Sequence, residues 1–174
     1  EVTTSGGLIR YGFAGYHGAF SSHVQQNVGG IGVPTLVTYN VTDLSYGVQV
    51  ASNPSGPANT RIVVANQGVY NLQFSFQLAN SSTQIQTASF WIRLNGSDYP
   101  SSNTEIDVPG SHGGNSGKIV AAWNIMGVAT APGDYIQVVW SSTSATVTIE
   151  AIPAQTSPTR PATPSAIITL QQVA

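Results

Sequence analysis

The chain has 174 residues and a mass of 18.1 kDa, which corresponds to one domain able to bury roughly 70% of the surface of its unfolded chain. Charged residues make up only 7% of the sequence and the formal net charge is −2, which excludes the basic surface needed to bind nucleic acid or anionic lipid. So few charges, in a chain rich in Ser, Thr, Asn, Gln and Gly, favour a protein held in a fixed assembly. A secreted β domain with an uncharged surface is the alternative.

The sequence has no Cys, so neither disulfide bonds nor thiolate chemistry are expected. No window approaches the ~18 consecutive apolar residues of a membrane-spanning segment, and no membrane insertion is expected. The chain begins at Glu1 without Met or a signal-like apolar run. This start indicates a processed or trimmed chain, or part of a longer one.

The first 34 residues are rich in glycine and aromatic residues, among them Tyr11, Phe13, Tyr16 and Phe20. They contain one strand-like run, at 8–13. We expect residues 1–34 to form an irregular arm that packs on the domain or on a partner, and residues 35–174 to form the domain itself.

The clearest element of the chain lies at 69–78, where from residue 70 onward apolar and uncharged polar residues alternate without interruption. Period two predicts a strand with one face in a core and the other in a polar setting. A second strand at 88–94 ends at Asn95-Gly96, the dipeptide best suited to the positive φ angles of a type I′ hairpin turn. The apolar positions of the first strand are Tyr70, Leu72, Phe74, Phe76 and Leu78.

Helical periodicity is absent, and turns of Gly, Pro or Asn chemistry recur along the chain. About ten short strands spaced near a dozen residues predict an all-β fold, a two-sheet antiparallel jelly-roll sandwich. The expected strands after the arm are 35–41, 46–51, 60–65, 69–78, 88–94, 104–108, 118–128, 134–141, 146–152 and 165–173.

Two of these strands, 118–128 and 134–141, are mainly apolar on both faces. A monomeric sandwich buries only one face of each sheet, so the second face needs a cover. Subunit association is the simplest cover, and shielding by the N-terminal arm is the alternative. The candidates for the subunit interface are Trp123, Ile125, Tyr135, Trp140 and Ile168.

Five segments occur in the order of the C1q/TNF-like domain: Gly18-Ala-Phe20, 34–39 (PTLVTY), 68–74 (GVYNLQF), 91–96 (WIRLNG) and 133–138 (GDYIQV). The chain resembles this family from residue 17 to residue 173. The resemblance implies a jelly roll that assembles as a compact homotrimer.

The C-terminal part departs from the animal members, since 166–170 (AIITL) replaces their aromatic final strand. A proline-rich segment at 153–161 followed by 165–172 is similar instead to phage versions of the domain, which occur in tail fibres, head fibres and capsid decorations. This resemblance implies a non-enzymatic virion structural protein, located on the virion surface or extracellular. Its partners would be other capsid or tail proteins and a host surface glycan or protein. The alternative is a secreted C1q-like recognition or carbohydrate-binding module.

Residues for catalysis are not evident. His17, His23 and His112 are the only imidazoles, and none lies in a hydrolase or metal motif, so no catalytic residue is assigned and no enzyme is expected. Glu105 and Asp107 share one face of a predicted strand near the loop 111–115, where hard oxygen ligands would suit calcium. An ordinary solvated strand edge is the alternative, and no other cofactor is expected.

Ligand recognition is expected at one aromatic residue and at loop tips. Trp91 shares a strand face with Ser89, and indole rings stack on sugars. The loops 95–99 and 111–117 are expected at one end of the trimer, because loops on a rigid scaffold carry recognition. The candidates are therefore Trp91, Asn95, His112 and Asn115.

Overall fold

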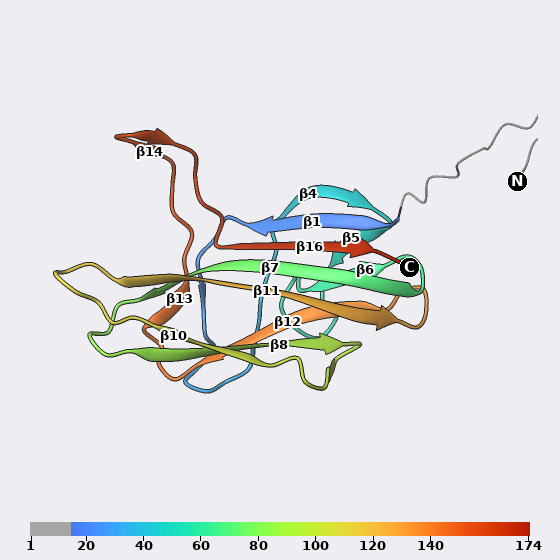
Figure 1. Cartoon of the computed structure of the whole chain (residues 1–174), viewed down its shortest axis with the longest axis horizontal. Coiled ribbons are helices and arrows are strands. Elements are labelled where there is room, and N and C mark those ends of the chain that lie inside the picture. The colour runs from blue at the N-terminus through green and yellow to red at the C-terminus, as the bar shows by residue number, and fades with distance from the viewer. Residues whose placement is uncertain (1–14) are drawn as a thin grey trace, which may run out of the picture.

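The computed structural model describes residues 15–174 as two antiparallel β-sheets stacked face to face (Figure 1). Within this range no helix occurs that is long and apolar enough to span a bilayer. The all-β two-sheet sandwich predicted from the alternating pattern is confirmed. Residues 8–13, predicted as a strand of the arm, lie outside the described residues.

The first sheet, here called the β7 sheet, is built on the longest strand of the central pattern. β7 (Gly68–Asn80) pairs along its whole length with β11 (Gly117–Ala129), whose other edge pairs with no described strand. On its other side the order continues through β16 (Ala166–Gln172) and β1 (His17–Ser22) to β4 (Val41–Tyr46), and two short strands, β13 (Val147–Ile149) and β2 (Gln26–Asn27), extend the sheet beside the end of β7.

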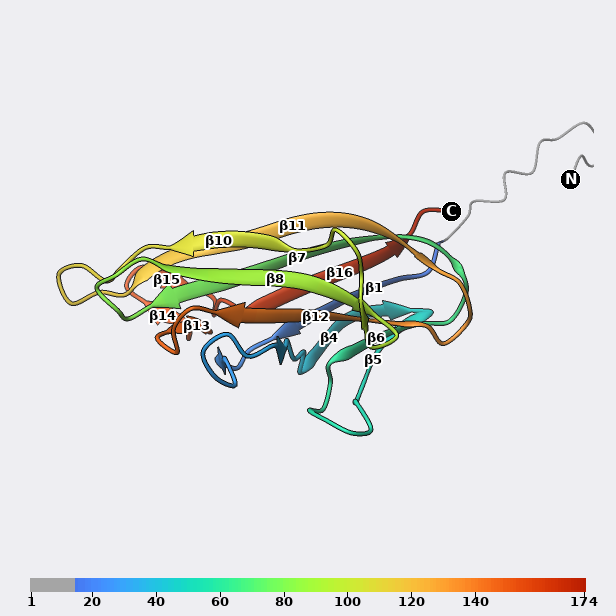
Figure 2. The same ribbon diagram turned by 90° about the horizontal axis from the view of Figure 1, so that it is seen from below.

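The second sheet, here called the β8 sheet, faces the viewer in Figure 2. Its order is β10 (Thr104–Val108), β8 (Gln86–Leu94), β12 (Tyr135–Ser142), β6 (Arg61–Val64) and β5 (Val48–Ala51). Two short strands complete it, because β3 (Thr35–Leu36) pairs with β12 and β9 (Ser97–Asp98) pairs with β8. A separate hairpin consists of β14 (Gln155–Thr156) and β15 (Thr159–Arg160).

Aromatic side chains join the two sheets. Phe74 and Phe76 of β7 stack at 4.6 Å between ring centroids, and Phe76 lies 5.2 Å from Phe90 of β8. Phe90 in turn stacks on Trp140 of β12 at 6.2 Å. This aromatic column is buried, and it explains why the even positions of β7 from Tyr70 to Leu78, predicted to face a core, are all apolar.

The described part of the predicted arm belongs to the sandwich, which corrects the boundary expected at residue 34. β1 lies between β16 and β4, and its Phe20 is completely buried. The chain closes on itself at this end, since the backbone amide of Gln172 donates to the carbonyl of Tyr16 at 2.7 Å. The sequence pattern does not reveal this strand, because Gly18 and Ser22, which are not large apolar residues, occupy its other inward positions.

The predicted strand 35–41 is also corrected. Only Thr35–Leu36 pair in the β8 sheet, and the chain then crosses to the β7 sheet, where β4 begins at Val41. By contrast the turn at Asn95-Gly96 is confirmed: its φ angles are 51° and 84°, and it connects β8 to β9.

A buried amide fastens the far end of β7. Asn80 is fully buried, and its Nδ2 donates to the carbonyls of Gln84 at 2.8 Å and Pro109 at 3.1 Å. Its Oδ1 accepts from the amide of Ser82 at 2.9 Å and from the hydroxyl of Thr146 at 3.0 Å. One side chain therefore holds three connecting segments together.

Candidate functional site

The outer face of the β7 sheet, which points away from the core, carries no charged side chain at its centre. The strand registers align its outward residues in three rows across β1, β16, β7 and β11, and none of the rows contains Asp, Glu, Lys or Arg. The rows are His17–Gln171–Asn71–Met126, Ala19–Thr169–Gln73–Asn124 and Ser21–Ile167–Ser75–Ala122. We call this surface the outer β7 face.

Apolar side chains are exposed on and around these rows. Met126 in the first row is 59% exposed, and Ile167 in the third row is 39% exposed. Leu44 and Tyr46 of β4 are exposed at one margin, and Val120 and Val128 of β11 at the other. Exposed apolar groups gathered on one sheet face indicate an interaction surface rather than scattered surface residues.

One polar atom on this face also lacks a partner. The Oδ1 atom of Asn71 is buried without a hydrogen bond from any described residue. It belongs to a hollow lined by His17, Ala19, Leu44 and Gln171, among others. An unpaired buried acceptor costs roughly 1–3 kcal/mol, so a donor on a molecule bound to this face would be favourable.

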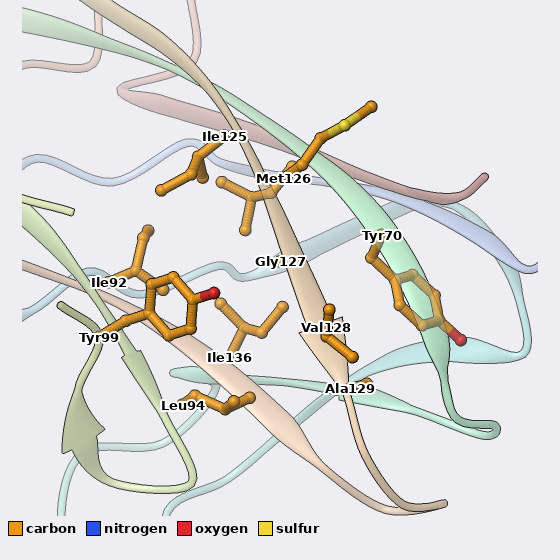
Figure 3. A pocket seen from close by; sticks show the side chains of 11 residues that line it. Tyr70, Ile92, Leu94, Tyr99, Ile125, Met126, Gly127, Val128, Ala129 and Ile136 are labelled. Atoms are coloured by element: carbon orange, nitrogen blue, oxygen red, sulfur yellow. The ribbon is translucent and has the colours of Figure 1, made fainter. Parts of the chain in front are cut away.

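An apolar groove opens between the two sheets beside β11 (Figure 3). Tyr99, Ile92 and Ile136 face one another across it, while the Met126 side chain points away. Its cavity holds only about 30 Å³, room for one or two waters. The groove is therefore too narrow for a small-molecule ligand but adds an apolar strip next to the free edge of β11.

The predicted interface residues are only partly placed on such surfaces. Trp140 and Ile168 are completely buried in the core, so their assignment to an interface is wrong. Trp123 and Ile125 point inward and pack, half-buried, against the core. Tyr135 lies on the other sheet, with the Arg61 guanidinium carbon 4.1 Å from its ring centroid.

The two strands that are apolar on both faces have different covers. On β12 the outward Val139 is completely buried within the chain, where Thr35–Leu36 pair with this strand. Thr35–Leu36 follow the predicted arm of residues 1–34, so shielding of this strand by the arm itself stays a prediction. On β11 the outward Val120, Met126 and Val128 remain exposed, and these residues rather than Trp123 and Ile125 form its uncovered face.

The predicted recognition loops lie at opposite ends of the sandwich, which corrects their expected clustering. His112 and Asn115 bond to each other through their backbones around Gly113-Gly114, at an exposed tip beyond the Asn80 end of β7. Asn95 lies at the other end and has a structural task. Its side chain accepts from the amide of Tyr135 at 2.9 Å and donates to Asp134 at 2.8 Å.

Trp91, Glu105 and Asp107 share the outer face of the β8 sheet. Asp107 accepts a hydrogen bond from the Thr87 hydroxyl at 2.8 Å, and Glu105 accepts one from Ser89 at 3.3 Å. Among residues 15–174 no group of three or more His, Asp or Glu side chains is placed to hold a metal ion. The two carboxylates therefore have hydroxyl partners, as in a solvated strand edge.

The histidines are dispersed. Nδ1 of His17 lies 2.9 Å from the Gly15 carbonyl, and Nε2 of His23 lies 3.5 Å from the Ser21 hydroxyl. Within the described range neither imidazole has a carboxylate partner that would orient it as a general base. These contacts resemble ordinary surface hydrogen bonds.

Asp134 clamps the turn between β11 and β12. Its Oδ2 accepts from the backbone amides of Thr130 at 2.7 Å and Ala131 at 3.0 Å, and its Oδ1 accepts from Asn95. The hydrogen bond from Asn95, aided by the two amides, holds the pKa of Asp134 below its ordinary value of 3.8.

A carboxyl whose pKa is lowered in the folded state stabilises the protein above the pKa of the unfolded state and loses this effect as pH falls through the folded value. We therefore expect Asp134→Asn to lower the free energy of unfolding by about 2 kcal/mol at pH 7, because an amide NH₂ would face backbone donors. The loss should shrink below about pH 4. Urea unfolding between pH 3 and 7 measures this, with exposed Asp43→Asn as control; an equal loss at all pH values would contradict the prediction.

Comparison with known proteins gives a fold but no family. No protein-family model matches the chain, and no curated protein matches it in sequence. Crystal structures of murine APRIL at pH 8.5 and pH 5.0 are similar to it, with TM-scores of 0.51 and 0.53 and identities of 11% and 10%. In both, the match covers 91% of this chain and 99% of the other. The chain therefore has the two-sheet jelly-roll fold of the TNF-like kind.

Proposed function

We propose that this chain is a non-enzymatic structural protein that forms a homotrimer through the outer β7 face. In this proposal the trimer stands on the surface of a virus particle, as a phage capsid decoration, head fibre or fibre knob. The observation that carries the proposal is the face itself, which is uncharged along three rows and exposes Ile167 and Met126.

Self-association suits this surface better than binding of a charged partner. Polar amides and hydroxyls between apolar groups can pair across an interface without the cost of burying ions. The unpaired Oδ1 of Asn71 adds an acceptor for a donor from the neighbouring subunit. The C1q/TNF-like resemblance of the sequence supports three as the number of subunits.

A closed ring needs two different patches, one on each side of the subunit. The outer β7 face supplies the first, and the apolar strip beside β11, with Tyr99 and Val128, supplies the second. Packing the free edge of β11 against a neighbour would also cover unpaired backbone groups, which sheet proteins rarely leave open.

The virion location is supported by composition and by the C-terminal resemblance. A protein fixed in a particle needs little charge to stay dispersed, and only 7% of this chain is charged. The segments 153–161 and 165–172 are similar to phage members of the C1q/TNF-like group. Gold-labelled antibody against the chain should decorate particles from the encoding phage; a chain found only free in the medium would favour the secreted recognition module.

Light scattering on the purified chain tests the assembly. We expect a mass three times 18.1 kDa, unchanged by a chelator because Glu105 and Asp107 already have hydroxyl partners. A monomer or a dimer would overturn the trimer. Dissociation only in chelator would instead indicate an ion at the subunit contacts, which Glu105 and Asp107 on the outer face of the β8 sheet do not reach in the arrangement proposed here.

A further inference from the structure

An open depression on the outer face of the β8 sheet encloses about 510 Å³, within the range of ligand-binding sites. Trp91 of β8 and Asp98 of β9 contribute its aromatic and charged groups, and the remaining lining consists of Ser89, Tyr99, Ser101, Ser102, Asn103 and Ser141. It lies on the sheet opposite the outer β7 face, and of its lining residues only Tyr99 also belongs to the apolar strip beside β11 that is proposed as the second subunit contact.

The aromatic ring is held in place by a charged neighbour. Nε1 of Trp91 donates to Oδ1 of Asp98 at 2.8 Å, and Nε of Arg93 donates to the same oxygen at 2.6 Å. The second oxygen, Oδ2, receives no hydrogen bond from a described residue, and the Asp98 side chain is 61% exposed. The site therefore combines a fixed indole with a free carboxylate oxygen.

The loop that forms the other wall is fixed as well. Ser102 is buried, accepts from the backbone amide of Ile92 at 3.0 Å and donates to the Tyr99 carbonyl at 2.7 Å. Next to it, Ser101 and Asn103 are exposed and make no side-chain hydrogen bond with a described residue. Because this wall is already held in place and its exposed polar groups have no partners, ordering it on ligand binding costs little conformational entropy.

From this geometry we propose that the depression binds a neutral pyranose of a glycan, with the sugar ring on Trp91 and its hydroxyls on Asp98, Ser101 and Asn103. Aromatic rings have an apolar face that suits the C–H face of a sugar. A carboxylate oxygen accepts strong hydrogen bonds from hydroxyls.

Charge selects the neutral ligand. Arg93 on this face is already paired with Asp98, and Glu105, which has no ion-pair partner among the described residues, repels an anionic sugar. A cation would find Asp98 already paired with Arg93. It would also bring no hydroxyl groups with which the serine and asparagine side chains could form hydrogen bonds. The proposal does not rest on the trimer, and the two sets of residues share only Tyr99.

The test is ¹⁹F NMR of the full chain labelled with 5-fluorotryptophan, which gives three resonances because the chain has three Trp residues. Trp91→Phe assigns the Trp91 signal. Methyl glycosides of mannose, galactose, glucose and N-acetylglucosamine are titrated to tens of millimolar, since a Kd of about 1 mM corresponds to only ~4 kcal/mol. N-Acetylneuraminic acid and choline serve as the anionic and cationic probes.

We expect at least one neutral glycoside to shift the Trp91 signal saturably and leave the signals of Trp123 and Trp140 in place. Asp98→Asn should weaken binding about tenfold or more, Asn103→Ala should weaken it less, and the exposed Asp43→Asn should not. The proposal is overturned if no neutral glycoside moves the Trp91 signal, if only choline or the acidic sugar does, or if Asp98→Asn and Asn103→Ala both bind like the parent.

Discussion

Ile167→Glu is expected to convert the trimer into monomers of 18.1 kDa. Ile167 lies in the Ser21–Ile167–Ser75–Ala122 row of the outer β7 face, where a trimer would bring three carboxylates into a dry interface. An unpaired buried charge costs several kcal/mol, more than a single contact can offset. Light scattering at a fixed protein concentration measures the loss.

Ile85→Glu is the matched control, because Ile85 is exposed in the connection between β7 and β8, away from this face. The control should remain a trimer, and both variants should keep the β-sheet circular dichroism of the parent because each replaced side chain is solvent-exposed in the single subunit. A trimer that survives Ile167→Glu, or that dissociates equally with Ile85→Glu, would contradict the proposed interface.

Asn80→Leu should have the largest effect on folding stability, lowering the free energy of unfolding by about 3–4 kcal/mol. Leucine has the same number and branching of side-chain heavy atoms as asparagine, but it leaves the carbonyls of Gln84 and Pro109 and the Ser82 amide unpaired in a buried site. The urea midpoint should fall while the slope of the transition stays constant, because the same surface is exposed on unfolding.

Asn103 serves as the control because it is exposed and has no hydrogen bond to a described residue. The same substitution there removes no buried hydrogen bonds. Asn103→Leu should change the free energy of unfolding by less than about 0.5 kcal/mol. Similar losses in the two variants would mean that the Asn80 hydrogen bonds do not stabilise the fold.

The strands in which apolar and polar side chains alternate were predictable, because this alternation shows directly which side chains face the core. The inward-facing even positions of β7 from Tyr70 to Leu78 and the Asn95-Gly96 turn follow from residue types alone. β1 was not predictable in this way: its inward residues are Gly18, Phe20 and Ser22, and two of them carry no apolar signal. The pairing partners, not the residues themselves, make this segment a strand.

The candidate surfaces were harder to predict for a related reason. Alternation shows that β11 has two apolar faces, but only its register with β7 decides that Trp123 points inward and Met126 outward. In the same way, β10 and β11 carry the 111–117 loop to the end opposite Asn95, and local sequence contains no information on that separation. The pairing of Trp91 with Asp98 depends on the β8–β9 hairpin bringing them to one face.

The hydrogen bond between Gln172 and Tyr16 holds both ends of the described chain together at one end of the sandwich. The chain enters and leaves at one pole, while the Gly113-Gly114 tip lies at the other, beyond the Asn80 end of β7. A peptide inserted between those two glycines, both of which have positive φ and open space around them, would be displayed at the pole that carries no covalent attachment. In a symmetric trimer the three copies would point the same way, which makes the fold a natural multivalent scaffold.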